Sequence, residues 1–253
     1  MIGDVVGRPG RRAVRQLVPG LRDELSLDLV IANGENAAAG FGITPDTARE
    51  LLDGGVDVIT SGNHVWDQKE IYPLLDGEIP VLRPLNYPPA APGRGVIIVR
   101  GTVVVNLQGR TFMPVQIDDP FRAMDVFLQG FSEKPRGVFI DFHAEATSEK
   151  AALAWYLDGR VSAVAGTHTH VGTVDTKIMP RGTAFVSDLG MCGVIDSIIG
   201  DEPGPVLERF LTGILVRLSV GSGPAQFNAV FFETDDRTGL AKDIRRVDRR
   251  VDA

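Results

Sequence analysis

Four short apolar runs, rich in valine and isoleucine, limit most strongly how this chain can fold. They are DLVIA (28–32), VDVITS (56–61), GVFIDF (137–142) and VSAVAG (161–166). Apolar residues fill nearly every position of each run rather than every second one, which is typical of strands covered on both faces. The sequence therefore predicts buried strands in a sheet with further structure packed on each side.

Three segments carry the signals that begin and end helices. In residues 44–55, Thr44 is a suitable N-cap, Pro45 occupies the first helical position and Gly54 marks the end. The other two helices, with their expected first and last residues, are 119–130 (Asp119 and Gly130) and 148–159 (Ser148 and Gly159). Helices between buried strands predict an α/β class of fold.

Two further segments, 95–109 and 213–235, contain apolar stretches joined by glycine-containing turns, which predicts antiparallel strand pairs. We expect two mixed sheets with flanking helices in one domain, 1–253, because no repeat or linker marks a boundary. The charged tail, 243–253, is expected to fray. Only three residues precede Asp4, so the first strand is expected to be short or to begin outside this chain.

Cysteine content and charge narrow the class of protein. The single cysteine, Cys192, forms no internal disulfide, and no apolar run has the roughly 20 residues of a membrane span. The N-terminus lacks the apolar core of a signal peptide. We therefore predict a soluble, cytoplasmic protein. A net charge of −7 argues against an extended nucleic-acid surface, but not against a small phosphate substrate, because a bound metal reverses the local field.

Side chains that bind metals or transfer protons follow the predicted strands. They are Asp4 after the first residues, Glu35 and Asn36 after 28–32, Asn63 and His64 after 56–61, His143 after 137–142, and His168 and His170 after 161–166. Ligands of α/β proteins bind beyond the carboxyl ends of the strands. All four histidines of the chain lie at such ends. In an extended segment, His168 and His170 would face the same side.

The chemistry of this set indicates a metal. Imidazole, carboxylate and amide oxygen together suit a first-row transition metal better than calcium or magnesium. No thiolate belongs to the set, which argues against a structural zinc site.

The order of these residues resembles the calcineurin-like metallophosphoesterases, whose motifs run Asp-x-His, Gly-Asp, Gly-Asn-His, His and Gly-His-x-His. The corresponding segments here are GDVVG (3–7), NGEN (33–36), GNH (62–64), DFHAE (141–145) and GTHTH (166–170). Val6 replaces a histidine and Glu35 replaces an aspartate. Both departures resemble the branch of YmdB-like phosphodiesterases, as do GDVVGRPGR (3–11), GNHVWD (62–67) and NLQGRTFM (106–113).

This resemblance implies a four-layer α/β/β/α sandwich that holds two metal ions (iron, manganese or zinc) and acts on 2′,3′-cyclic nucleotides. The implied ligands are Asp4 and His170 for the first metal, Asn63, His143 and His168 for the second, and Glu35 as the bridge between them. Val6 leaves the first metal one protein ligand short. Either Asn36 or water fills that position.

Charge balance is consistent with phosphodiester hydrolysis. Two divalent ions bring four positive charges, and Asp4 and Glu35 remove two, so the remainder suits a phosphodiester monoanion with a hydroxide. Two ions about 3.5–4 Å apart activate a water and stabilise the attacking and leaving oxygens. His64 adjoins a ligand but is not needed as one, so it is the candidate general acid, with Asp67 as a candidate partner.

Several residues have an ordinary structural interpretation beside a functional one. Arg8 either lies on a solvated helix start or binds substrate phosphate. Trp66 either packs or stacks on a base, and Asp188 either accepts hydrogen bonds or takes part in catalysis. Cys192 is interpreted as a small buried residue, because no histidine is left to activate it.

Two other functions stay open beside a phosphodiesterase whose partner is a small phosphodiester or cyclic nucleotide. One is a phosphomonoesterase such as a nucleotidase. The other is a regulatory protein with a non-catalytic metal site, against which the Asn63–His64 pair argues. The sequence leaves the oligomeric state open.

Overall fold

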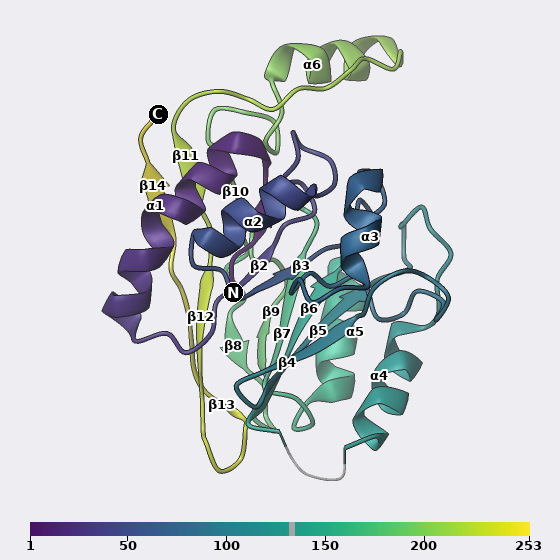
Figure 1. Ribbon diagram of the computed structural model, residues 1–253, viewed down its shortest axis with the longest axis vertical. Coiled ribbons are helices and arrows are strands. Elements are labelled where there is room, and N and C mark those ends of the chain that lie inside the picture. Colours follow the sequence, from purple (N-terminus) through teal and green to yellow (C-terminus); the bar gives the residue numbers. More distant parts are fainter. Residues whose placement is uncertain (132–134) are drawn as a thin grey trace.

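The computed structural model describes residues 1–131 and 135–253 (Figure 1). Its helices are α1 (Gly7–Leu25), α2 (Pro45–Asp53), η1 (Lys69–Ile71, a 3-10 helix), α3 (Tyr72–Leu75), α4 (Pro120–Gln129), α5 (Thr147–Leu157) and α6 (Pro203–Thr212). Its strands are β1 (Asp4–Val5), β2 (Ile31–Asn33), β3 (Val58–Thr60), β4 (Val96–Val99), β5 (Thr102–Gln108), β6 (Gly137–His143), β7 (Ala163–Thr167), β8 (Lys177–Ile178), β9 (Ala184–Val186), β10 (Met191–Val194), β11 (Ala225–Phe227), β12 (Val230–Thr234), β13 (Ala241–Arg246) and β14 (Arg249–Val251).

The larger sheet has six strands in the order β4-β5-β6-β7-β9-β8. Strands β5, β6, β7 and β9 are parallel, and β4 and β8 pair antiparallel at the two edges. β4 and β5 form the hairpin predicted over 95–109, turning at Arg100 and Gly101, which both have positive φ. The parallel register brings the carboxyl ends of β6 and β7 together, since His143 lies opposite Thr167.

The second group of strands is built around the N-terminus. β1 is an edge strand of a four-stranded sheet with the order β1-β10-β11-β14. Ile2, which precedes β1, forms a β-bridge with Ala32 of the β2–β3 pair. The β12–β13 hairpin links both groups of strands, because Val230 N donates to Met1 O at 2.8 Å and Ala241 N donates to Gly182 O at 2.9 Å. The ends of β1, β2, β3, β6 and β7 meet in one region, because residues in or directly after these strands contact one another.

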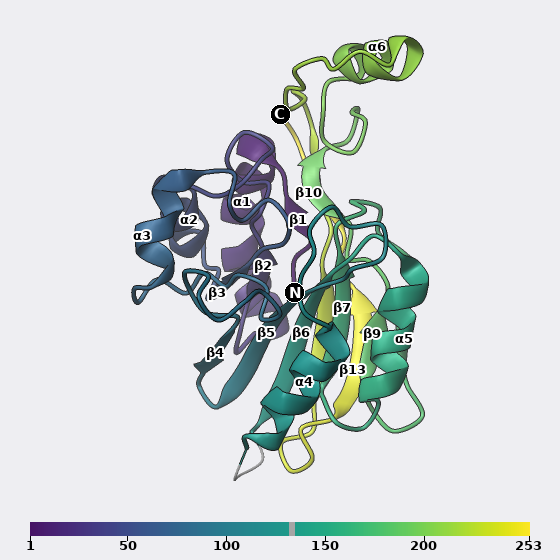
Figure 2. The same cartoon turned by 90° about the vertical axis from the view of Figure 1, so that its right-hand side faces the viewer.

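Figure 2 shows α1 and α2 on one side of the strands and α4 and α5 on the other, and apolar clusters hold these elements together. Helices α1 and α2 pack on the group of strands around the N-terminus through buried residues that include Val14, Val18, Leu51, Ile59 and Phe227. Helices α4 and α5 pack on the larger sheet through buried residues that include Met124, Leu153, Leu157, Ile140 and Phe142. A smaller cluster joins the two groups of strands: Ile31, Val58, Leu82 and Val104. The predicted mixed α/β class is confirmed.

Two of the three predicted helices begin as their caps indicate. The Thr44 side chain accepts from Thr47 N, and the Asp119 side chain accepts from Phe121 N and Arg122 N. The third prediction was wrong at its start, because α5 begins at Thr147 with Ala146 as its N-cap. Lys150 N already donates to Ala146 O, so Ser148 falls inside the first turn.

Two expectations about the C-terminal part were wrong. Within 213–235 only β11 and β12 are strands, and residues 213–219 run from the far end of α6 back toward the body without forming a strand. The tail does not fray, because β13 and β14 pair with β12 and β11. Apolar residues such as Val247 and Val251 are buried while the arginines between them face outward. Among the described helices, none is long and apolar enough to span a membrane.

Candidate active site

The strand ends bring the predicted site residues together. Glu35 and Asn36 lie in the turn after β2, Asn63 and His64 in the turn after β3, and His143 at the end of β6. Asp4 begins β1, and His168 and His170 follow β7. Arg8 lies nearby on the first turn of α1 with an exposed side chain.

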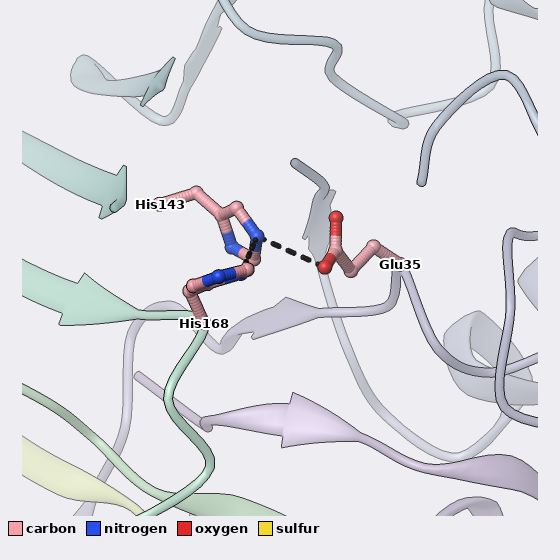
Figure 3. Close-up of side chains that lie close together, drawn as sticks. All are labelled: Glu35, His143 and His168. Atoms are coloured by element: carbon pink, nitrogen blue, oxygen red, sulfur yellow. Dashed lines mark hydrogen bonds and ion pairs between the residues drawn. The ribbon is translucent and has the colours of Figure 1, made fainter. Parts of the chain in front are cut away.

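Three polar atoms converge on the Nε2 atom of His143, and Figure 3 shows the two that belong to Glu35 and His168. This nitrogen lies 2.9 Å from Glu35 Oε1, 3.0 Å from Asn63 Oδ1 and 3.0 Å from His168 Nδ1. Glu35, His143 and His168 present ligand atoms within 4.8 Å of one another. His143 and Glu35 are buried, at 0% and 1% exposed. The four residues come from four separate strand ends, as the sequence predicts.

In both His143 and His168, one ring nitrogen contacts a partner outside the cluster, and the other ring nitrogen faces into the cluster. His143 Nδ1 lies 3.0 Å from Thr167 Oγ1, which itself donates to Asp141 Oδ1 at 2.6 Å, so Nδ1 carries the proton. His168 Nε2 lies 3.1 Å from the Glu145 carboxylate. Fixing one ring nitrogen with an acceptor is the usual way in which proteins orient a metal-binding histidine.

A bound metal ion explains the positions of these four side chains better than hydrogen bonds among them do. With the outer nitrogens protonated, an ion that displaces the Nε2 proton of His143 would meet a carboxylate oxygen, an amide oxygen and two imidazole lone pairs. An ion at the usual 2.0–2.2 Å from nitrogen and oxygen ligands places neighbouring octahedral ligands about 3 Å apart. The measured spacings agree with that value.

A second group of atoms lies around Asp4, which is 0% exposed. Asp4 Oδ1 lies 3.8 Å from His170 Nε2, and His170 Nδ1 lies 2.7 Å from Ile199 O. Asp4 Oδ1 and Asn36 Oδ1 are buried and meet no hydrogen-bond donor among the described residues. The Asn36 amide donates to Gly40 O at 2.9 Å, which fixes its oxygen on the opposite side. Both orphaned oxygens are suitable ligands for a first ion.

The pKa values of the ionisable residues in this buried site depend strongly on the charges of their neighbours. Burial opposes ionisation of Glu35, but the positive charge of His143, its hydrogen bond to Glu35 and the hydrogen bond from His64 N together outweigh it and lower the pKa of Glu35 to about 2. Burial also disfavours charge on His143, yet Glu35 raises its pKa to about 9. Burial, with the charge of His143, lowers the pKa of His168 to about 3, and burial raises the pKa of Asp4 to about 6. The carboxylates therefore favour a positive charge beside them, which a divalent ion supplies.

The backbone of the His168–His170 turn differs from the extended segment that we predicted. His168 has φ 99° and His170 has φ 65°, both in the left-handed region, which costs about 1–3 kcal/mol for such residues. Thr169 anchors the turn, because its hydroxyl donates to Asp188 Oδ2 at 2.8 Å. Lys150 Nζ donates to the same oxygen at 2.8 Å. Asp188 therefore accepts hydrogen bonds, as the structural interpretation predicts.

His64 lies at the edge of the cluster. Its Nδ1 is 2.8 Å from Asp67 Oδ2, and its backbone N donates to Glu35 Oε2 at 3.2 Å. Nε2 is then the ring nitrogen left to face a substrate. Trp66 packs edge-on against Tyr72 and Tyr87, with ring centroids 5.5 Å away in each case, which favours its structural interpretation.

Sequence reasoning named Asp67 as the partner of His64, which the structure places 2.8 Å from His64 Nδ1, but it did not identify the outer partners of His143, His168 and His170. Asp141 and Glu145 lie within the DFHAE motif and could have been considered from their position beside His143. Thr167 precedes His168 and gives no separate signal. The Ile199 carbonyl, which accepts from His170, has no side-chain signal at all. Cys192 is buried, and burial raises the pKa of its thiol, in line with its interpretation as a packed residue.

Solved structures with the same fold define the class of protein. A phosphatase from Mycoplasma pneumoniae superposes with a TM-score of 0.93 at 32% identity, covering 99% of this chain and 92% of that one. A hypothetical protein from Thermus thermophilus superposes with a TM-score of 0.92 at 48% identity, covering 98% and 97%. The fold is that of a phosphatase of the metallophosphoesterase type.

The family follows from the sequence. Residues 1–247 match the model of the YmdB-like proteins, and the chain belongs to this family. The Bacillus subtilis protein named 2′,3′-cyclic-nucleotide 2′-phosphodiesterase is 46% identical over 250 residues, covering 97% of this chain and 94% of that relative. The predicted resemblance is confirmed. The predicted hydrolysis of phosphoric esters agrees with the names of these relatives.

Proposed function

We propose that this protein hydrolyses 2′,3′-cyclic nucleotides with two bound divalent metal ions, iron, manganese or zinc. The observation that carries the proposal is the set of four inward-facing ligand atoms, His143 Nε2 and its three neighbours, beside the orphaned oxygens of Asp4 and Asn36. The name of the Bacillus subtilis relative supports the choice of substrate. We also propose that the layers follow the order α/β/β/α, which the core clusters support.

The proposed ligands follow the two groups of atoms. Asn63, His143 and His168 hold one ion, Asp4 and His170 hold the other, and Glu35 lies between them. Asn36 is the proposed additional ligand of the ion at Asp4, because its buried side-chain oxygen meets no hydrogen-bond donor among the described residues. When bound, two such ions lower the pKa of a water nucleophile and neutralise charge on the phosphate.

His64 is the proposed general acid. Asp67 accepts from Nδ1 and holds the imidazole in one orientation, which leaves Nε2 to give its proton to the departing ribose oxygen. The bond between His64 N and the Glu35 carboxylate fixes the distance of this turn from the ligands. Arg8, exposed on the first turn of α1, is the proposed contact for a phosphate oxygen.

The test combines metal analysis with turnover of 2′,3′-cyclic AMP by the manganese-loaded protein. About two ions per chain and metal-dependent turnover are expected. His64→Asn should lose roughly 10²–10⁴-fold in kcat and keep its metal. Metal without turnover in the unaltered protein would instead support a regulatory role. Faster hydrolysis of a mononucleotide than of the cyclic diester would indicate a phosphomonoesterase.

A further inference from the structure

Phe41 is an aromatic side chain beside the proposed general acid. Its ring centroid lies 5.2 Å from that of His64, and the two rings meet edge to face at 70°. The side chain is 38% exposed although it borders the buried site. An exposed aromatic ring in this position is available to a ligand that reaches His64.

The turn that carries Phe41 is fixed to the site by hydrogen bonds. Gly40 N donates to Asn36 O at 3.1 Å, and the Asn36 side chain returns a bond to Gly40 O at 2.9 Å. Phe41 O accepts from Gln68 Nε2 at 2.8 Å. Gly42 has φ 75°, and a Cβ there would lie 2.7 Å from the Gln68 side chain. The ring is therefore held in a constant position relative to Asn36 and His64.

We propose that Phe41 is the surface on which the base of the nucleoside 2′,3′-cyclic phosphate stacks; this rests on the proposed function. Both ester oxygens of such a substrate belong to the same ribose. The oxygen that His64 protonates stays on that ribose, so the sugar lies against His64 and its base lies one sugar ring away. Every base offers a π-face to an aromatic ring, so the contact selects nucleosides without selecting one base.

The experiment compares Phe41→Ala with the unaltered protein on two substrates. One is 2′,3′-cyclic AMP, and the other is methyl ribofuranoside 2′,3′-cyclic phosphate, which has no base. For the nucleotide, KM should rise roughly ten- to hundredfold with kcat little changed. For the base-free diester, neither constant should change. Phe41→Tyr should restore the lower KM.

Trp155→Ala is the matched control, because it removes an aromatic side chain that is 58% exposed on α5. Metal content is measured in each variant. An unchanged KM for the nucleotide in Phe41→Ala, or an equal rise for both substrates, overturns the stacking proposal. No turnover of either substrate by the metal-loaded, unaltered protein refutes the proposed function instead.

An independent feature is the arm formed by residues 202–218, which contains α6 and projects from the body (Figures 1 and 2). Its exposed apolar side chains are Leu207 (51%), Phe210 (82%), Leu211 (84%), Ile214 (66%) and Leu215 (83%). Leu207, Phe210 and Leu211, three and four residues apart, lie on one face of α6, and Ile214 and Leu215 follow directly after the helix. Such a cluster of large apolar side chains marks an interaction surface.

The charge of the arm favours one kind of partner. It holds two glutamates and two arginines, Glu202, Glu208, Arg209 and Arg217, and no lysine. Helices that bind anionic membranes and surfaces that bind nucleic acid are basic. A surface with equal numbers of both charges does not repel a second copy of itself, which a two-fold axis can bring against it apolar face to apolar face. We infer that the arm joins two copies of this chain.

The test is the concentration dependence of mass in solution, measured by sedimentation equilibrium. The unaltered chain should form dimers, and Phe210→Glu and Leu211→Glu should be monomers with an unchanged circular dichroism spectrum. Val126→Glu, at a residue 71% exposed on α4, is the matched control and should remain dimeric. A monomer at every concentration, a dimer that survives both arm substitutions, or arm-dependent binding of the monomer to phosphatidylserine vesicles overturns the inference.

Discussion

Replacing Thr167 by valine should weaken metal binding without a large change in shape. The hydroxyl accepts from His143 Nδ1 at 3.0 Å and donates to Asp141 Oδ1 at 2.6 Å, so it fixes both the orientation and the tautomer of the proposed ligand. Losing such an outer contact typically lowers metal affinity about 10–100-fold, which corresponds to about 1.4–2.8 kcal/mol. Asp141 keeps its contacts with Thr60 and Asn33, so the fold should persist.

Competition with a chromogenic chelator would give the affinity of each variant for zinc and manganese. Thr183→Val is the matched control: Thr183 is also 0% exposed, and its hydroxyl donates to Val161 O at 2.7 Å away from the site. Both substitutions should lower the free energy of unfolding of the metal-free protein by about 1–3 kcal/mol, because each hydroxyl makes at least two hydrogen bonds whose buried partners lose their contact. Equal metal affinity in the two variants would refute the role assigned to Thr167.

Two further predictions concern buried groups behind the site. Lys150→Met leaves the Asp188 carboxylate buried without its cation, and should lower the free energy of unfolding measured in urea by about 3–5 kcal/mol; a loss below about 1 kcal/mol would contradict this. Cys192 should not react with Ellman's reagent at pH 8 in the folded protein, because the thiol is buried and its pKa is raised, and it should react fully in guanidinium chloride. Rapid reaction under native conditions would show that the thiol is accessible.

The sequence predicted the convergence of the site because that convergence follows from topology. Parallel strands present their carboxyl ends at one edge, so a polar residue after each apolar run reaches the same region. The register of β6 and β7 realises this directly by placing His143 opposite Thr167. Helix starts at Thr44 and Asp119 were also predictable, since a side-chain cap is a local interaction.

What could not be predicted depends on contacts between distant parts of the chain. The left-handed backbone at His168 and His170 is held by Asp188 and by the Ile199 carbonyl, which follow about twenty to thirty residues later. The charged tail forms strands only because β11 and β12 offer edges to pair with. Strand propensity depends on such surroundings, so neither result follows from composition.

At position 6, a packed valine takes the place of a residue that would otherwise be a metal ligand. It replaces the histidine of the wider superfamily, yet it is only 3% exposed and leaves no gap. A Cβ on Gly200 would lie 2.7 Å from Val6 Cγ1, so the valine packs tightly beneath the segment whose Ile199 carbonyl orients His170. A histidine here would have to displace that segment. With valine at this position, the proposed further ligand of an ion at Asp4 is Asn36, which Gly7 N holds in place by donating to its backbone carbonyl at 2.9 Å.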